Sequence, residues 1–496
     1  MQVKLRGPPL SWAITLCCAS AYLLYGYDEG VVGGLVSQPS FLDALGNPGS
    51  GYLGTIIALY DVGCMIGCVT AAIVGFKVGR RYVIFGGCMV MIVGAAIQTS
   101  THGAGQFIAG RIICGIGNGL NTSTIPVYVS ETTRSNRRGS MVAVQLAIVI
   151  FGLVVAYWVD YGTVHSLSGE IVWRFPIAFQ IVFAVVTGAI ILLLPESPRF
   201  LYNQGEIHKS AEILSQLMDV PIDDASVIFI QAEMEAAVRV EKEQPFRWKR
   251  FFEKSDVKTS RRLVICFMLQ MFQQFTGIHV TAVYATVILT DNVGLSLETS
   301  SLVAGFIQLA FFVGTLPPIF MIDRYGRRRL LLIGAIAMAI CMSIFTAAIA
   351  VPTVATGRLA LAMLILYELW FGATWNCTPW IIAPEITPLH LRHVGGAICA
   401  FSEWLWTFVI VLITPAAIRN TGWRIYILFC IMCVVAFVFV WFFLPETAGK
   451  TLEEIDYIFA TGEAKDRLER QFLDAQEETL DNDAKEIAVN VEGKTA

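Results

Sequence analysis

The stretch from Trp423 to Leu444 reads WRIYILFCIMCVVAFVFVWFFL, and its only charged residue is Arg424. An α-helix needs about 20 predominantly apolar residues to cross the hydrocarbon core of a bilayer, because each residue advances the helix by about 1.5 Å. This stretch meets that requirement. It therefore predicts a membrane-spanning helix.

The rest of the chain repeats this pattern, and twelve apolar runs have the length of a membrane span. They begin near Ser11, Gly51, Tyr82, Phe107, Gly139, Trp173, Leu263, Ser300, Leu330, Leu359, Val394 and Trp423. Of the 496 residues, 55% are hydrophobic and only 15% are charged, whereas an ordinary soluble domain carries roughly 25% charge. We therefore predict an all-α membrane protein with twelve transmembrane helices.

The positions of the basic residues predict the orientation of these helices. Lysines and arginines cluster in segments 77–81, 134–138 and 324–329, which follow spans 2, 4 and 8, and the intervening loops hold few. Cytoplasmic loops carry the excess of Lys and Arg in membrane proteins. We therefore expect a multi-pass protein with both termini in the cytoplasm.

The polar segments divide the chain into four parts. We predict six-helix halves at 1–194 and 263–444, a cytoplasmic linker with short helices at 195–262, and an acidic cytoplasmic tail at 445–496. The formal net charge is −4, and the tail alone holds 14 acidic and 6 basic residues. The remainder is only mildly basic, so no large basic field is available for nucleic acid.

Three markers recur at a spacing of about half the chain. Gly79-Arg-Arg81 returns as Gly326-Arg-Arg328, Glu131 with Arg138 returns as Glu385 with Arg392, and Pro195-Glu-Ser returns as Pro445-Glu-Thr. The offsets are 247, 254 and 250 residues. The chain is therefore predicted to be a tandem repeat of two six-helix halves, as in transporters whose halves rock against each other.

The repeated charges all fall at predicted cytoplasmic helix ends. They can serve only as topology anchors, or they can form an inner gate whose Glu–Arg pairs close when the site faces out and break when it faces in. Exposed ion pairs contribute little each, which suits a gate that must open. The gate candidates are Arg80, Arg81, Glu131, Arg138, Glu196, Arg199, Asp323, Arg327, Glu385, Arg392 and Glu446.

These motifs and several others together resemble the sugar porters of the major facilitator superfamily. The matching stretches are Arg111-x3-Gly115-x-Gly117-x-Gly119, Pro126-x-Tyr128-x-x-Glu131, Pro195-Glu-Ser-Pro-Arg199, Gln273-Gln-Phe-Thr-Gly277, Asp323-Arg-Tyr-Gly-Arg-Arg328, Pro379-Trp380 and Pro445-Glu-Thr. The stretch Trp173-Arg-Phe-Pro-Ile-Ala-Phe-Gln180 resembles the fungal branch, which includes hexose, pentose and glycerol transporters. The resemblance covers nearly the whole chain and implies the major facilitator fold.

Three positions depart from the family pattern. Phe76 stands where the first Gly-Arg-Arg motif should be preceded by an acid, and His279 and Glu403 stand where asparagines are usual. The last two positions belong to the substrate site in the family. They leave the exact substrate open.

Two charges inside the predicted spans fall at the same depth. Asp28 lies about 17 residues into span 1, which runs outward, and Arg111 lies about five residues into span 4, which runs inward. Charges within membrane spans are rare and usually functional. In proton-coupled sugar porters the matching Asp takes the proton and the Arg pairs with it in one conformation, although a static buried pair is the alternative. We expect the neighbouring Glu29 to have an interfacial or structural role, and Asp61 and Glu368 receive no role.

The resemblance also implies a sugar site. Its residues would be Gln145, Gln273, Gln274, His279, Trp380 and Glu403, with Trp404 and Tyr284 nearby. Amides both donate and accept hydrogen bonds, which suits polyols, and an indole face covers the apolar surface of a sugar ring. An unpaired carboxylate at mid-membrane is unfavourable, so we hypothesise that His279 pairs with Glu403.

No pattern in the sequence supports an enzyme. Ala448-Gly-Lys-Thr451 resembles the end of a phosphate loop, but Leu444 occupies the position of its first glycine. All 12 cysteines lie in apolar runs, where cysteine behaves as a small hydrophobe, and no metal site is predicted.

The leading hypothesis is a monomeric proton symporter in the plasma membrane. It would carry a small neutral sugar or polyol, with the proton as coupling ion, no other cofactor and the lipid bilayer as its surroundings. The alternatives are a passive sugar uniporter and a nontransporting sugar sensor.

Overall fold

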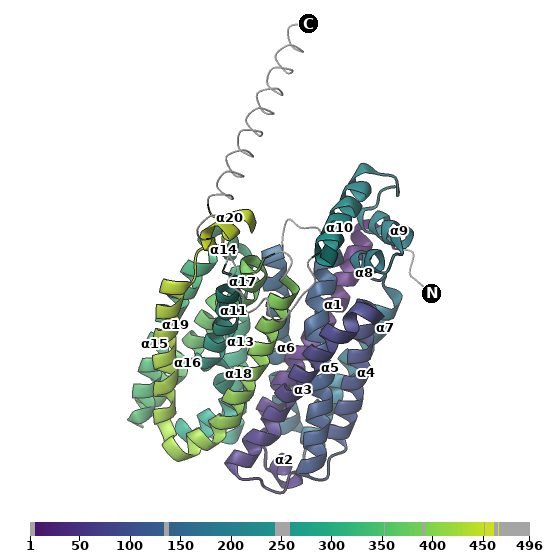
Figure 1. Cartoon of the computed structure of the whole chain (residues 1–496). Coiled ribbons are helices and arrows are strands. Elements are labelled where there is room, and N and C mark those ends of the chain that lie inside the picture. The colour runs from purple at the N-terminus through teal and green to yellow at the C-terminus, as the bar shows by residue number, and fades with distance from the viewer. Residues whose placement is uncertain are drawn as a thin grey trace.

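The computed structural model describes residues 5–132, 138–243, 258–351, 353–388, 392–450, 452–460 and 465. Within these ranges the regular elements are helices. Figure 1 shows two helical bundles side by side, one formed by the purple and blue first half of the chain and the other by the teal to yellow second half. The molecule is therefore a two-bundle helical protein.

The first half forms six long helices and one short one. They are α1 (Gly7–Leu35), α2 (Pro39–Ala44), α3 (Ser50–Val78), α4 (Arg80–Thr99), α5 (Ala104–Thr132), α6 (Arg138–Ser166) and α7 (Ile171–Leu193). The short helix α2 connects α1 to α3 at one end of the bundle (Figure 1). We call this end the α2 end.

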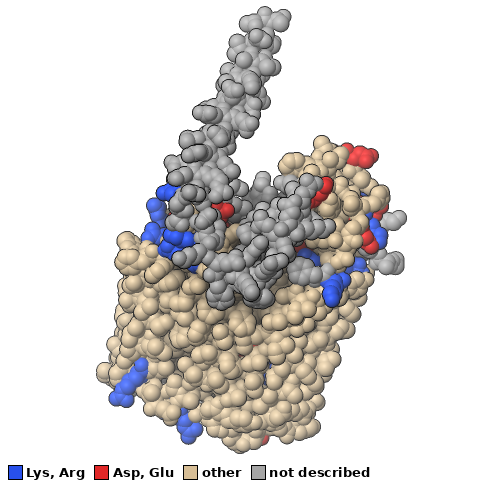
Figure 2. All heavy atoms as spheres, viewed as in Figure 1, with Lys and Arg blue, Asp and Glu red and all other residues tan. Residues whose placement is uncertain are grey.

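The polar segment between the halves lies at the other end of the molecule. It forms α8 (Pro198–Asn203), α9 (Ile207–Met218) and α10 (Ala225–Glu243). The last described helix, α20 (Leu452–Phe459), lies at this same end, which we call the linker end (Figure 1). Figure 2 shows that Lys and Arg gather there, above a wide belt with almost no charge. That belt matches the surface that lipid tails cover.

The second half contains three spans that are each broken into two helices. Its helices are α11 (Thr259–Phe275), α12 (Ile278–Val287) with the π-helical turn η3 (Ile288–Asn292), α13 (Leu297–Thr315), α14 (Pro318–Tyr325), α15 (Arg327–Ala350), α16 (Val354–Thr374), α17 (Thr378–Ile386), α18 (Arg392–Thr421), the 3₁₀ turn η5 (Gly422–Arg424) and α19 (Ile425–Phe443).

Each break has a local cause in the sequence. Between α11 and α12, Gly277 has a φ of 99°, a conformation that favours glycine. Pro317 lies between α13 and α14, Pro318 is the first residue of α14, and Pro379 lies in the first turn of α17. Proline has no N–H to donate, so the helical hydrogen bonding is interrupted at these points. Irregular backbone at membrane depth is tolerated where it lines a cavity or is buried in protein.

The predicted count of twelve spans is confirmed. Ten stretches of the described residues are long and apolar enough to cross a membrane, and the last of them, Gly395–Phe443, contains both α18 and α19. The remaining span is α5, whose polar Arg111, Asn118 and Asn121 are buried inside the bundle. The fold is all-α, with a twelve-helix transmembrane part.

Glycines on α3 and α5 bring these two helices into close contact. A Cβ atom on Gly115 would lie 3.1 Å from the Cα of Gly63, and one on Gly119 would lie 2.9 Å from the Cα of Gly67. Small residues permit this approach in membrane helices. The glycine run of the sequence is therefore a packing surface.

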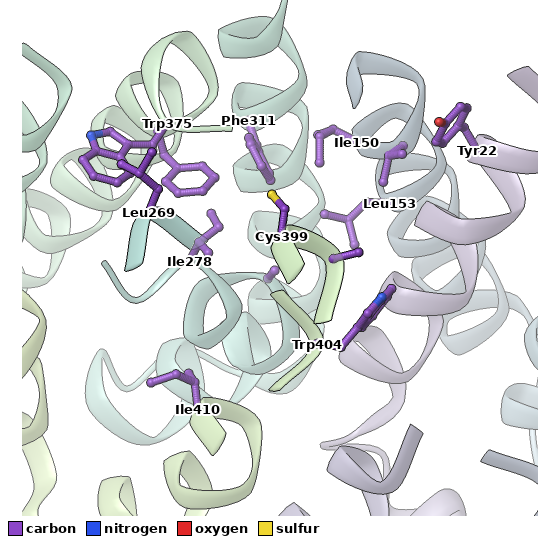
Figure 3. Close-up of a cluster of buried hydrophobic side chains, with 14 of the residues drawn as sticks. Tyr22, Ile150, Leu153, Leu269, Ile278, Phe311, Trp375, Cys399, Trp404 and Ile410 are labelled. Carbon is purple, nitrogen blue, oxygen red and sulfur yellow. The ribbon is translucent and has the colours of Figure 1, made fainter. Parts of the chain in front are cut away.

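The two halves meet along several helix pairs. Helix α1 packs against α12, α3 against α18, and α6 against α13 and α14. One buried apolar cluster contains side chains of both halves, among them Tyr22, Leu153, Leu269 and Trp404 (Figure 3). All twelve cysteines have free thiols. The halves thus share a continuous core, and the polar residues described next interrupt it.

Candidate functional site

Asp28 and Arg111 form a buried ion pair inside the first half. The distance from Arg111 Nη1 to Asp28 Oδ1 is 3.8 Å, and both side chains are almost fully buried. The thiol of Cys114 donates to Asp28 Oδ2 at 3.5 Å. The guanidinium lies 4.1 Å from the centre of the Tyr60 ring and donates to the carbonyl of Ile57 at 3.4 Å. The two charges, which were predicted to lie at the same depth, are therefore in contact, although the distance between them is long for an ion pair.

Glu29 points away from Asp28 and into the space between the halves. Successive residues of an α-helix are turned by about 100°, so Asp28 faces Arg111 while Glu29 faces the second half. Its Oε1 atom lies 2.6 Å from Nε2 of His279 on α12. Glu29 also lines a cavity between the halves, and the interfacial or structural role expected for it stays a prediction.

The hypothesised pair of His279 with Glu403 is also wrong. The only described partner of His279 is Glu29, and His279 Nδ1 is buried without a hydrogen bond. Glu403 lies within electrostatic reach of the imidazole but does not contact it as a salt bridge. The sequence alone could not identify Glu29 as the partner of His279, because α1 and α12 belong to different halves and their packing is not visible in the sequence.

A small cavity lies between the two halves at this point. It is lined by α1, α3 and α5 of the first half and by α12 and α18 of the second, through Glu29, Ile57, Tyr60, Asp61, Arg111, His279, Val283, Thr407 and Val411. Its volume accommodates little more than about one water molecule. The halves must therefore move apart before a sugar fits here.

Two acids of this region received no role from the sequence. Asp61 lines the cavity and is only 5% exposed. Glu368, on α16, is fully buried beside the Thr281 hydroxyl. Asp160, on α6, is also buried and was not singled out by the sequence patterns. The signal that could have found all three is an acid within an apolar run.

The two adjacent glutamines have different surroundings. Gln273 donates to the carbonyls of Trp375 and Asn376 at 2.8 and 3.0 Å, so it holds the break between α16 and α17. Gln274 is fully buried, and neither of its polar side-chain atoms has a hydrogen bond. It lies beside the carboxyl group of Glu403. Its amide interacts with that carboxyl group, and its remaining donor and its carbonyl oxygen stay available to a ligand.

The other predicted sugar-site residues are distributed around the same core. The Trp404 ring packs against Tyr25 at 5.6 Å and Tyr60 at 6.3 Å, and its indole N–H is buried beside the Cys68 thiol. Gln145 accepts a hydrogen bond from Tyr22 at 3.4 Å.

Two of the candidates are less available to a ligand. The hydroxyl of Tyr284 donates to the Val411 carbonyl at 3.0 Å, which commits it to joining α12 and α18. Trp380 is half-buried against the apolar core. Among the predicted sugar-site residues, Gln274 and Glu403 therefore retain the most hydrogen-bonding capacity, and the Trp404 ring lies in the same core.

A cluster of charges lies at the linker end of the first half. Glu131 accepts hydrogen bonds from Arg80 Nε at 3.0 Å and Nη2 at 3.1 Å, and from the Ser197 hydroxyl at 2.5 Å. Glu196 accepts the backbone N–H groups of Arg80, Arg81 and Ser197 at 3.0, 3.2 and 2.8 Å. The first N–H groups of a helix have no partner within the helix. Glu196 therefore caps α4.

The second half repeats this arrangement at equivalent positions. Arg327 Nη2 lies 2.9 Å from Glu385 Oε1, and the Thr447 hydroxyl donates to Glu385 at 2.7 Å. Glu446 accepts the backbone N–H of Arg327 at 2.8 Å and thereby caps α15. The internal repeat of the sequence thus corresponds to two matching carboxylate clusters.

The clusters differ in part from the predicted gate. Asp323 forms an ion pair with Arg327 at 2.9 Å, and Arg199 has an interaction partner of its own. The side chains of Arg138 and Arg392 lie outside the described residues. The described pairs of both clusters join elements of the same half, so they stabilise each half internally.

Burial raises the pKa of the Glu196 carboxyl above its ordinary value. Hydrogen bonds from the N–H groups of Ser197, Arg81 and Arg80 oppose this rise. The charge on Glu196 therefore depends on the intact turn at the start of α4.

Twelve helices in two six-helix halves, with charged and amide side chains between them, define a membrane transporter with the major facilitator fold. The chain belongs to the Sugar (and other) transporter family, whose sequence model matches residues 14–459. This result confirms the resemblance to sugar porters.

Individual relatives match over most of their length. The chain is 34% identical to the MFS-type transporter oryC of Aspergillus oryzae, over 97% of this chain and 93% of that protein. It is 33% identical to the sugar transporter STL1 of Saccharomyces cerevisiae, over 92% of this chain and 82% of that protein. Among solved structures, the MFS proton:xylose symporter XylE bound to 6-bromo-6-deoxy-D-glucose superimposes with a TM-score of 0.77 and 26% identity, covering 91% of this chain and 99% of XylE.

Proposed function

We propose that the protein is a proton-coupled symporter that carries a small neutral sugar or polyol across the plasma membrane. The observation that carries this proposal is the buried Asp28–Arg111 pair, which lies beside a cavity between two halves. A carboxylate at this depth is unfavourable unless it is paired or protonated. Asp28 therefore has two stable forms, one paired with Arg111 and one carrying a proton.

Proton movement is coupled to transport because Asp28 cannot carry a proton and pair with Arg111 at the same time. A proton from outside neutralises Asp28 while Arg111 is displaced, and the return of Arg111 releases the proton to the inside. The length of the pair, 3.8 Å, and its shared contacts with Tyr60 and Cys114 suit a pair that must separate in every cycle. The name of XylE, a proton:xylose symporter, supports this proposal.

The proposed substrate site lies beside the proton site. Gln274 and Glu403 offer free donors and acceptors to hydroxyl groups, and the Trp404 indole provides an apolar face. Gln145, Gln273, His279, Trp380 and Tyr284 complete the proposed set. The family membership and the name of STL1, a sugar transporter, support a sugar or polyol as the substrate class.

The linker end is proposed to face the cytoplasm, because the lysines and arginines gather there (Figure 2). Alternating access would then expose the cavity to the two sides in turn. The pair of Arg80 with Glu131 and that of Arg327 with Glu385 each lie within one half, so we propose that they contribute to the inner gate by holding the helix ends of each half in the arrangement that closes the cavity when the site faces out. The protein is proposed to work as a monomer.

Uptake in cells that lack their own sugar transporters tests the proposal. A membrane potential of about 100 mV contributes roughly 2.3 kcal/mol per charge and one pH unit about 1.4 kcal/mol, which together support roughly 500-fold accumulation. We expect accumulation that a protonophore abolishes. Equilibration unaffected by the protonophore would indicate a passive uniporter, and absence of uptake with retained sugar binding would indicate a sensor.

A further inference from the structure

Neighbouring residues of α1 connect two different parts of the molecule. Asp28 contacts Arg111 within the first half, whereas Glu29 contacts His279 of the second half at 2.6 Å. Both contacts are withdrawn from solvent, since the side chains of Glu29 and His279 are 16% and 9% exposed. Protonation of Asp28 therefore takes place next to the Glu29–His279 contact, which joins the two halves.

Arg111 contacts Asp28 and lines the same cavity as Glu29 and His279. An arginine has five N–H donors, yet Nε and Nη1 of Arg111 are buried without a hydrogen bond, and Nη2 makes only a 3.4 Å bond to the Ile57 carbonyl. The guanidinium therefore has donors available for a second acceptor, and the acids that line the cavity with it are Glu29 and Asp61.

We propose that Glu29 is a second coupling acid, to which Arg111 moves when Asp28 takes a proton. The proton binds the Asp28 carboxylate, Arg111 leaves it for Glu29, and Glu29 releases His279. The exchange breaks the bond between α1 and α12 and lets the cavity open at the α2 end. This inference rests on the proposed function, in which Asp28 carries the coupling proton.

The Glu29–His279 bond is the innermost of several bonds that close the α2 end. Further along, the Thr286 hydroxyl donates to the Gly33 carbonyl at 3.2 Å and contacts the Ser37 hydroxyl at 3.2 Å, and the Tyr157 hydroxyl donates to the Ala282 carbonyl at 2.5 Å. These bonds involve neutral groups, and charge-assisted bonds are about twice as strong. Among these described hydrogen bonds, the one between Glu29 and His279 is therefore the strongest restraint on the closed α2 end.

Other titratable groups surround this pair. His279 is influenced by Glu403 on α18, Asp61 on α3 and Glu368 on α16, and Glu29 acts on Tyr25 one turn earlier. A pH profile of transport would mix all of their contributions. The test therefore measures opening directly and uses combined variants.

The experiment labels a cysteine introduced at Val411 with a membrane-impermeant thiol reagent added from the α2 end. Val411 lines the cavity and is only 2% exposed, so it reacts only when the halves part. The parent protein without this substitution supplies the background. A variant is labelled only if it elutes from size exclusion as a single symmetric peak. The assay needs no sugar, so its result does not depend on whether sugar uptake is found.

The proposal predicts about tenfold faster labelling in Glu29→Gln and in His279→Asn, which corresponds to about 1.4 kcal/mol. The double variant should label no faster than either single variant, because both remove one interaction. Asp28→Asn should also label faster, because Arg111 is then free to move to Glu29. Unchanged labelling in Glu29→Gln or in Asp28→Asn, or multiplicative effects in the double variant, would overturn the proposal.

Two further comparisons separate coupling from a structural defect. Asp160→Asn removes another buried carboxylate of the first half and should label at the rate of the parent carrying the Val411 cysteine. Labelling of that parent, expressed at each pH relative to a solvent-exposed cysteine because thiol reactivity itself falls with pH, should rise as the pH is lowered and Asp28 takes a proton, whereas the relative labelling of Glu29→Gln should not change. A Glu29→Gln protein that keeps the parent's response to pH would refute the exchange.

Discussion

Alanine in place of Gly79 should destabilise the first half of the protein through the capped start of α4. Gly79 has φ 94° and ψ 159°, a region that is essentially restricted to glycine. A Cβ atom there would also lie 2.5 Å from Glu196 Oε2. The substitution must therefore strain the backbone and also move Glu196 from the N–H groups of Arg80 and Arg81.

The size of the effect follows from these two contributions. Backbone strain of this kind costs about 1–3 kcal/mol, and the loss of a hydrogen bond to a charged group costs about 1.5–3 kcal/mol. Together they give roughly 2.5–6 kcal/mol. For a unit of about 200 residues this predicts a melting temperature at least about 5 °C lower, measured on purified protein in detergent by fluorescence-detected size exclusion.

Matched glycines make the comparison specific. Gly326 has φ 84° and would place a Cβ atom 2.5 Å from Glu446 Oε2, so Gly326→Ala should cause a similar loss. Gly86 lies within α4 with nothing within 4 Å of its Cβ position, and Gly86→Ala should leave the protein as stable or stabilise it by up to about 1 kcal/mol. Equal melting temperatures for Gly79→Ala and Gly86→Ala would refute the capping argument.

Three other predictions concern transport. Asp28→Asn should abolish uphill uptake and keep substrate binding, because asparagine preserves the shape but not the titrating group; continued accumulation against a gradient would exclude Asp28 as the proton site. Arg80→Gln and Arg327→Gln should each unpair a partly buried glutamate and increase labelling of a cysteine at the linker end of the cavity by roughly 3–10-fold, and unchanged labelling in both would leave only a role in topology. Glu403→Asn should change the order of preference among hexoses, pentoses and polyols, because an ionised carboxylate only accepts hydrogen bonds; an identical order would remove Glu403 from the site.

Much of the fold was predictable because membrane spans are long apolar runs. The twelve runs gave the helix count, including α5, whose polar face is directed into the bundle. The breaks in the second half were not predicted, because hydropathy continues across them. Gly277 and Pro318 were visible in the sequence, but only packing determines whether such a residue kinks a helix or divides it.

The site was predictable where two charges could be compared by depth. Asp28 and Arg111 were matched because the rise per residue places both in the same half of the membrane. The partner of His279 could not be obtained in this way, because depth does not give the direction of a side chain around its helix. Glu29 and Glu403 are both acids near the middle of the bundle, and only the packing of α1 against α12 selects Glu29.

Proton movement driven by substrate tests the central claim most directly. Purified protein in liposomes that contain a pH-sensitive dye would receive a sugar or polyol that it binds, without an imposed pH gradient. The account predicts acidification of the lumen together with substrate entry in the wild-type protein, and no acidification with Asp28→Asn. Substrate entry without acidification in the wild-type protein would contradict it.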